Sequence, residues 1–240
     1  MDHQAWLSIM SILSAFIVVY FKDIRATIYD LAITKMTKDW YATVLEQIPE
    51  NARILDVGIG TGASLIANKD IIVRKKLTVV GVDYDADYVD RCKSLIKSNK
   101  LQSNISVYHQ SFYDFGKEGA SVKENKFDFI YFSGSLMIMP NPVGALNHAV
   151  NLLKNAKSGT IFTTQTFEKT ENRLLEIVKP LLKFITTIDF GRVTYENDFI
   201  ARVKEADLRI VEDKLITTSG ISGVVSKKDR AFHCIKLQRN

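Results

Sequence analysis

A glycine-rich turn, Gly58-Ile59-Gly60-Thr61-Gly62, is the first place where residue types and spacing could do chemistry. It follows an apolar run, residues 52–57, which predicts a buried strand. Glycine lets a backbone turn sharply and approach a ligand closely. Ala63 completes the pattern G-x-G-x-x-G/A, which is typical of dinucleotide-binding turns. Asp56 interrupts the apolar run. Because a buried carboxylate is costly unless it is hydrogen-bonded, we expect Asp56 to order the turn and to face a cationic ligand.

A second acid, Asp83, ends the next apolar run, residues 77–83. Ligands of parallel α/β sheets bind at the carboxyl ends of the strands, where an acid can accept hydrogen bonds from the hydroxyls of a ribose. Asp83 therefore predicts a ligand that contains a nucleoside. It does not choose between cofactor classes, because several of them carry a ribose.

Side chains that could accept a proton are few. His109 lies at the carboxyl end of the predicted strand 105–110, and Tyr113 follows that strand closely, so these two are the candidate catalytic residues. His148 is interpreted as a solvated histidine on a helix and His233 as a structural residue of a late strand. Asn141-Pro142 is interpreted as a turn. No set of side chains with metal-ligand spacing is found, and no metal site is predicted.

The elements that must position these residues alternate along the chain. Apolar runs bounded by glycine or polar residues predict buried strands, and longer segments with helical spacing predict helices. Alternation of this kind predicts an α/β fold with a doubly wound, mostly parallel sheet. The last two strands are expected to close the sheet as an antiparallel, hairpin-like pair. The expected strands are 52–58, 77–83, 105–110, 127–133, 159–167, 209–220 and 230–238, and the expected helices are 62–73, 85–99, 142–154, 171–186 and 199–207.

The first twenty-one residues differ from the rest. No Asp, Glu, Lys, Arg or His lies between His3 and Lys22, and Trp6 and Tyr20 stand where interfacial aromatic residues are expected. We interpret residues 1–21 as a single-pass or interfacial membrane anchor. Lys22 and the basic residue after it favour a domain on the cytosolic side. The alternatives are a cleaved signal peptide, a mitochondrial presequence, and a helix buried in a core or an assembly.

Composition bounds the remaining possibilities. The chain has 240 residues, a net charge of +5 and two cysteines. A content of 46% hydrophobic and 25% charged residues excludes a disordered chain, and two cysteines exclude a disulfide-rich scaffold. The basic residues are scattered, so a nucleic-acid partner is not expected. The domains expected are the anchor at 1–21, a helical cap over the ligand at 22–50, and the catalytic domain at 51–240.

The order of these motifs resembles that of class I S-adenosylmethionine-dependent methyltransferases. The resemblance covers roughly residues 27–237, and within the superfamily it is greatest to the small-molecule and quinone-type branch, methyltransferase domain types 11 and 25. It implies a seven-stranded, Rossmann-like methyltransferase sheet with an antiparallel last strand. An N-terminal hydrophobic helix before such a domain is similar to membrane-anchored relatives. The segments that carry the resemblance are LDVGIGTG, VVGVDYD, FDFIYFSGSLMIMPNP and LLKNAKSGTIFTTQTF.

The resemblance also implies roles for individual residues toward S-adenosylmethionine. Asp83 binds the ribose and Tyr84 packs on the adenine. Ser111 and Phe112 stand where many relatives carry an acid that accepts from the adenine, and this departure weakens the match. The other implied cofactor-binding residues are the glycines of the turn, which pass under the methionine part (Gly58, Gly60, Gly62), Asp56 near its amino group, Ser133 near the methyl group, and Tyr29 as a closing residue.

The function expected is direct in-line methyl transfer to a small lipophilic acceptor, which is a quinone, a lipid or a thiol. The apolar segment Leu136-Met137-Ile138-Met139 is a candidate wall for this acceptor. The alternative is a catalytically inactive methyltransferase-fold subunit of a membrane assembly. A protein or RNA methyltransferase is less favoured, because the positive charge is modest and scattered. The oligomeric state is not predicted.

Overall fold

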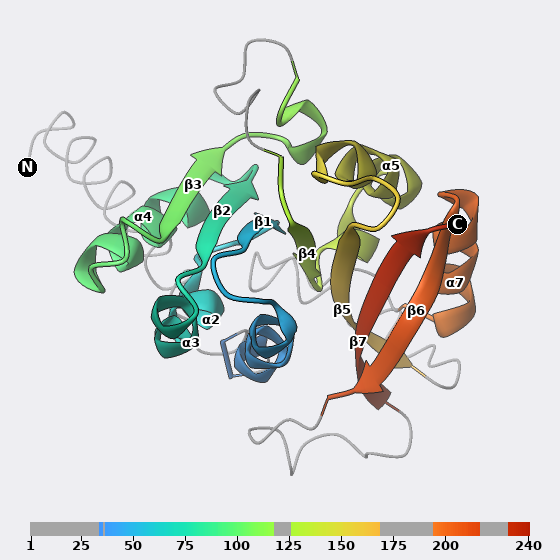
Figure 1. Ribbon diagram of the computed structural model, residues 1–240, viewed down its shortest axis with the longest axis horizontal. Coiled ribbons are helices and arrows are strands. Elements are labelled where there is room, and N and C mark those ends of the chain that lie inside the picture. The colour runs from blue at the N-terminus through green and yellow to red at the C-terminus, as the bar shows by residue number, and fades with distance from the viewer. Residues whose placement is uncertain (1–33, 36, 118–125, 169–193, 217–229) are drawn as a thin grey trace, which may run out of the picture.

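The computed structural model describes residues 34–35, 37–117, 126–168, 194–216 and 230–240. Seven strands form one sheet in the order β3-β2-β1-β4-β5-β7-β6, and Figure 1 shows them side by side from β3 at one edge to β6 at the other. The strands are β1 (Arg53–Val57), β2 (Thr78–Asp83), β3 (Ile105–His109), β4 (Phe129–Ser133), β5 (Thr160–Glu168), β6 (Leu208–Leu215) and β7 (Arg230–Arg239).

The direction of the strands confirms the expected sheet. The pairs β1–β2, β1–β4, β2–β3 and β4–β5 are parallel. Strand β7 is antiparallel to both β5 and β6. The chain reverses its strand order between β1 and β4, and the carboxyl ends of β1, β2, β4 and β5 meet at one edge of the sheet. A ligand crevice is expected at this reversal.

Helices cover both faces of the sheet. On one face, the core contains residues from α5 (Pro142–Leu152), α7 (Glu196–Glu205) and the 3-10 helix η1 (Phe112–Asp114). On the other face it contains residues from α2 (Ala63–Ile66), α3 (Lys69–Arg74) and α4 (Ala86–Ser98). The predicted doubly wound architecture is therefore confirmed.

A helix that precedes β1 also packs on this second face. Residues 34, 35 and 37–47 are helical, and we call this segment the first helix. It buries Trp40, Tyr41 and Val44 in the core. Thr37 Oγ1 lies 2.6 Å from Ser64 Oγ of α2, so the first helix is attached beside the glycine turn.

The end of the first helix is held by a buried lysine. Lys75 Nζ donates to the carbonyl oxygens of Leu45, Glu46 and Ile48 at 3.1, 2.6 and 2.8 Å. The last carbonyls of a helix have no partner within it and carry partial negative charge, so a cation there satisfies both needs. The sequence does not distinguish Lys75 from its basic neighbours Arg74 and Lys76.

The prediction of one continuous helix over residues 62–73 was wrong. The structure divides it into α2 and α3, with Asn68 at the junction. The Asn68 side chain donates to the carbonyl oxygens of Ser64 and Lys38 at 2.9 and 3.0 Å. Asparagine competes for backbone groups in this way, which favours helix ends over helix interiors.

Several expectations lie outside the described residues. These are the anchor at 1–21, the closing residue Tyr29 and the helix 171–186. Within the described ranges, none of the helices combines the length and the apolar character that crossing a membrane requires.

Candidate functional site at the carboxyl ends of the parallel strands

The glycine turn occupies the junction of β1, β2 and β4. Gly58, Gly60 and Gly62 have φ values of 74°, 60° and 69°, a region that residues with a side chain seldom adopt. The Gly58 N–H donates to the carbonyl oxygen of Val82 in β2 at 2.8 Å. On its other side, a Cβ at Gly58 would lie 2.7 Å from Ser135 Cβ, so the turn also contacts the loop after β4.

Asp83 holds this turn from β2. Its Oδ2 accepts from the Gly60 N–H at 2.8 Å, and its Oδ1 accepts from the Asp85 N–H at 2.9 Å. Burial raises the pKa of Asp83, while the hydrogen bonds from the Asp85 and Gly60 backbone lower it. An ionised carboxylate can accept about four hydrogen bonds, so both oxygens keep capacity for ligand hydroxyls.

Asp56 lies beside the turn with only 1% of its surface exposed. Its Oδ2 accepts from the Tyr41 hydroxyl of the first helix at 2.8 Å. Its Oδ1 is buried without a hydrogen-bond partner in the described part of the chain. Burial raises the pKa of Asp56 to about 7, the Tyr41 hydrogen bond lowers it, and the nearby charge of Asp83 raises it. A buried unpartnered acceptor is costly, and a cationic ligand group would satisfy it.

The residues expected around adenine gather at the β2–β3 side of this edge. Tyr84 is 75% exposed, and its carbonyl oxygen lies 3.0 Å from His109 Nε2. The Gln110 N–H donates to the Asp83 carbonyl at 2.9 Å, which brings Ser111 close to Asp83. Phe112 turns its ring into the core, 5.7 Å from the ring of Phe132, so only its backbone remains for a role toward adenine.

The loop after β4 forms the opposite side. A Cβ at Gly134 would lie 3.3 Å from Trp40 Cζ3, so the indole of the first helix lies against this loop. Trp40 is 2% exposed, and its Nε1 has no hydrogen-bond partner within the ranges that the structure describes. The Ser135 hydroxyl donates to the Val57 carbonyl at 2.5 Å, which ties the loop to β1.

The proposed acceptor wall is only partly available to a ligand. It forms the 3-10 helix η2 (Leu136–Ile138) and the residue after it. Leu136 is fully buried, and Met137 and Met139 pack against the core. Ile138 is 45% exposed. The segment therefore contributes mainly to packing, and Ile138 is its outward-facing apolar side chain.

The two candidate bases are held in different ways, and His109 lies away from Ser133. His109 in β3 is three strands from β4 in the sheet order, about 14 Å at a strand spacing of ~4.8 Å. The Tyr113 hydroxyl donates to the Asn141 carbonyl at 2.9 Å and accepts from the Asn141 N–H at 3.0 Å. Its donor and one acceptor position are thus taken by the backbone, and the geometry favours a structural role for Tyr113.

Tyr113 and Lys117 also have the Tyr-x-x-x-Lys spacing of short dehydrogenases. Tyr113 belongs to η1, and Lys117 follows it and pairs with Asp114 at 3.0 Å. The tyrosine hydroxyl is bound to Asn141, so the two side chains do not form a shared reactive pair.

Three further expectations meet different outcomes. His148 is half-buried, not solvated: its Nε2 lies 2.8 Å from the Phe115 carbonyl. His233 bonds Asp213 of β6 at 2.8 Å, which agrees with a structural role. Asn141 begins α5 as its N-cap and accepts from the Gly144 N–H at 2.9 Å, so the dipeptide is a helix start.

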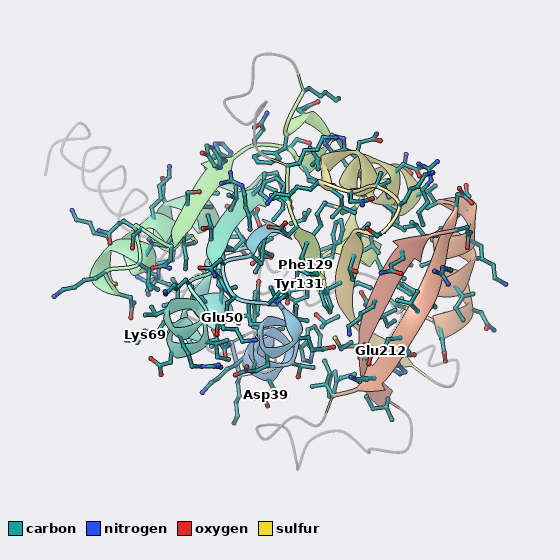
Figure 2. The ribbon with its side chains drawn as sticks, in the orientation of Figure 1. Asp39, Glu50, Lys69, Phe129, Tyr131 and Glu212 are labelled. Atoms are coloured by element: carbon teal, nitrogen blue, oxygen red, sulfur yellow. The ribbon has the colours of Figure 1, made fainter. Side chains whose placement is uncertain are left out.

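Sequence reasoning missed the two aromatic residues of the first helix. Trp40 and Tyr41 contact the loop after β4 and Asp56, respectively. The sequence offered one signal, which is two adjacent aromatic residues in a short amphipathic segment before the first strand. The sequence could not show that one of them contacts the loop after β4 and the other Asp56. Figure 2 shows Tyr131, the neighbour of Tyr41, near the middle of the sheet, far from Glu212 at its β6 side.

Comparison with solved structures shows the same fold in several proteins of low sequence identity. A S-adenosylmethionine-dependent methyltransferase from Geobacter sulfurreducens, solved with S-adenosyl-L-homocysteine, is 12% identical with a TM-score of 0.58, over 85% of this chain and 90% of that one. A geranyl diphosphate C-methyltransferase from Streptomyces coelicolor A3(2) is 12% identical with a TM-score of 0.60, over 85% and 79%. The [4+2]-cyclase SpnF is 12% identical with a TM-score of 0.62, over 84% and 81%.

Sequence comparison identifies the family. A search of curated proteins finds no match. The family model described as a methyltransferase domain matches residues 48–209, about two thirds of the chain. It is numbered 31 among such domains, and the finer assignment to types 11 and 25 stays a prediction. With the glycine turn, the two acids and the strand order, this match shows that the chain belongs to the methyltransferase domain family.

Proposed function

We propose that this chain transfers a methyl group from S-adenosylmethionine to a small lipophilic acceptor at the carboxyl ends of β1, β2, β4 and β5. The observation that carries the proposal is the glycine turn between two buried carboxylates. Asp83 is fixed on the Gly60 N–H, and Asp56 keeps one oxygen without a partner in the described part of the chain. A nucleoside with a cationic amino-acid tail fits such a pair of acids.

The residues present fit this cofactor. Asp83 would accept the ribose hydroxyls, and Asp56 would face the amino group of the methionine part. Tyr84 and the backbone near Ser111 would border the adenine. The positive φ of the three glycines leaves backbone, without side chains, at the floor of the site. When bound, the cofactor supplies a methyl group on a sulfonium, which is already a good leaving group.

The chain's own residues mainly position the reactants and exclude water. Orientation of bound reactants can lower a barrier by about 7–11 kcal/mol. Gly134, with the buried Trp40 packed against it, would lie beside the acceptor, since the loop after β4 flanks the glycine turn through Ser135. A general base is needed only for an acceptor that holds its proton at the working pH. A thiol or an ionised quinol would need little help of this kind.

Two observations support a lipophilic acceptor. The sequence begins with an apolar segment, residues 1–21, which we propose as a membrane anchor that keeps the domain at the cytosolic surface. A protein with the same fold, the geranyl diphosphate C-methyltransferase, acts on a prenyl compound. An anchored domain would meet quinones, lipids and lipophilic thiols at high local concentration.

The experiment uses the full chain in lipid nanodiscs with S-adenosylmethionine that carries a labelled methyl group. The acceptors are a quinol, a prenyl lipid, an alkyl thiol and, as a contrast, a hydrophilic amine. Labelled product from a lipophilic acceptor, lost in Asp83→Ala, is expected. Cofactor binding with transfer only to the amine would reject the lipophilic acceptor, and absence of cofactor binding in folded protein would reject the methyltransferase activity.

Membrane association is tested separately by vesicle flotation. The full chain is expected to float with vesicles in high salt, and a variant that lacks residues 1–21 is expected to remain in the dense fraction. Equal behaviour of the two proteins would remove the anchor from the proposal while leaving the methyl transfer intact.

A further inference from the structure

The contact between Tyr41 and Asp56 links the first helix to the cofactor site. The Tyr41 hydroxyl donates to Asp56 Oδ2 at 2.8 Å, and the residues are 15 positions apart in the sequence. Asp56 Oδ1, the other oxygen of the same carboxylate, has no partner among the described residues. One oxygen is therefore fixed by protein, while the other is buried and available.

We propose that Tyr41 is a positioning residue, which fixes the Asp56 carboxylate so that its second oxygen receives the α-ammonium group of the cofactor. The inference rests on the proposed function, because it concerns the same site. It goes further in assigning a role to the first helix. This helix lies before β1, and through Tyr41 its placement decides how well the site holds a cationic amino group.

The Tyr41 ring has little freedom to leave this position. It packs edge-on against the Tyr131 ring, with centroids 5.1 Å apart and an angle of 85°. Tyr41 is 3% exposed. The helix that carries it is attached at one end through Thr37 and Ser64, and at the other through Lys75. A hydroxyl held in this way orients its acceptor at little further loss of conformational entropy.

The charges around Asp56 decide how the site responds to pH. Three titratable groups influence it or are influenced by it: Tyr41 from the first helix, Asp83 from β2 and Tyr131 from β4. Burial raises the pKa of Asp56 to about 7, against the lowering effect of Tyr41. Burial also raises the pKa of Tyr131, so its hydroxyl stays neutral. The ammonium requires an ionised carboxylate, so affinity should fall as the pH drops below the pKa of Asp56.

Removal of the Tyr41 hydroxyl is therefore expected to change the pH profile of binding. Without this donor the ionised form of Asp56 loses its one protein hydrogen bond from the described residues, and its pKa rises. We call the pH below which affinity falls the break. The break should move upward by about one pH unit, which corresponds to about a tenfold loss of affinity at pH 6. A residue that only packed the core would lower stability and leave the break where it is.

The test measures the dissociation constant of S-adenosylhomocysteine by calorimetry between pH 5.5 and 7.5, with the full chain in detergent. This ligand carries the same ammonium group, which stays protonated across the range because a free amino acid has a carboxylate on the same carbon. Tyr41→Phe is compared with Tyr131→Phe. The control removes one hydroxyl from the same ring pair, but that hydroxyl bonds Thr164 at 2.9 Å.

The expected result is that the affinity of Tyr41→Phe still rises with pH up to 7.5 and is about tenfold lower than wild type at pH 6, whereas wild type and Tyr131→Phe both level off near pH 7. Asp56→Asn should bind weakly with no break in this range, and adding Tyr41→Phe to it should cause no further change. Equal breaks in wild type and Tyr41→Phe would overturn the inference while leaving the proposed function intact. No binding by folded wild-type protein at any pH would overturn both.

Discussion

The Asp83 carboxylate lies 2.8 Å from the backbone nitrogen of Gly60, so the acid at the end of β2 holds the turn at the end of β1. These residues are 23 positions apart, and the contact exists because β1 and β2 are parallel neighbours in register. The same carboxylate is the one proposed to bind the ribose. If Asp83 binds the ribose as proposed, the order of the glycine turn and cofactor binding both depend on this one side chain.

Replacement of Asp83 by alanine is expected to weaken S-adenosylmethionine binding by more than about 10- to 150-fold, which is the loss of a single charge-assisted hydrogen bond. The variant loses the charge-assisted hydrogen bonds to the ribose, each worth about 1.5–3 kcal/mol, and also the acceptor that orders Gly60. Calorimetric titration measures the change.

The matched control for this variant is Asp128→Ala at the opposite edge of the sheet. Asp128 also accepts from a backbone N–H, that of Arg53 at 2.8 Å, and pairs with Lys154 at 2.9 Å. It should lose stability but keep cofactor affinity. Similar affinity losses in both variants would show that general destabilisation explains the effect.

Gly58→Ala is expected to lower both stability and affinity. Its φ of 74° costs a residue with a Cβ about 1–2 kcal/mol, and the new Cβ would lie 2.7 Å from Ser135 Cβ. Gly116→Ala provides the comparison: its φ is 78°, and its Cβ would lie 2.7 Å from Leu152 Cδ2, the end of a flexible side chain. Thermal unfolding and calorimetry should show a larger loss of stability in Gly58→Ala and a loss of affinity in that variant alone.

The sequence predicted the sheet well because each parallel strand is a short apolar run between polar or glycine residues. The run 77–83 became β2, Thr78–Asp83, and the run 105–110 became β3, Ile105–His109. Buried parallel strands have this signature because both of their faces are covered. The helix 62–73 failed because its break depends on bonds from the Asn68 side chain, one of them to the carbonyl of Lys38 in a distant segment.

The acids and glycines of the candidate site could be identified from the sequence, but the side chains that contact them could not. Asp56 and Asp83 stand out as charges within apolar runs, so their importance can be inferred locally. The partner of Asp56 is Tyr41, and contacts across two elements leave no trace in residue spacing. Tyr113 shows the reverse case: its hydroxyl suggested catalysis, and tertiary structure uses it to hold Asn141.

Lys75→Met is expected to destabilise the protein by about 2–4 kcal/mol. The change removes the donor that the carbonyl oxygens of Leu45, Glu46 and Ile48 share, and leaves Leu45 with the longer bond of 3.3 Å from the Ile48 N–H; loss of a donor to buried acceptors carries a desolvation cost. Lys69→Met is the control, because Lys69 is exposed and makes one bond of 3.3 Å to Asn99. Denaturant unfolding should show a change within about 0.5 kcal/mol for the control. Equal effects would contradict the assignment of Lys75 as the group that holds the first helix.

Asp56→Asn is expected to make the protein more stable relative to wild type as the pH rises. The pKa of Asp56 is 3.8 in its ordinary state and about 7 in the folded protein. Between these values the folded state binds more protons than the unfolded state, so wild-type stability falls with rising pH by about 1.4 kcal/mol per unit from this group. Asparagine does not titrate, and its oxygen can still accept from Tyr41.

The difference in unfolding free energy, variant minus wild type, should therefore rise between pH 5 and pH 7 and level off above that range. Denaturant unfolding at several pH values without cofactor measures it, and Asp90→Asn, which changes an exposed carboxylate of α4, should show no such rise. The variant should at the same time lose cofactor affinity. A gain in stability together with a loss of cofactor binding would mean that the buried carboxylate serves ligand binding and destabilises the fold. A difference that does not change with pH would contradict this, because it would show that the folded protein accommodates ionised Asp56 without loss of stability.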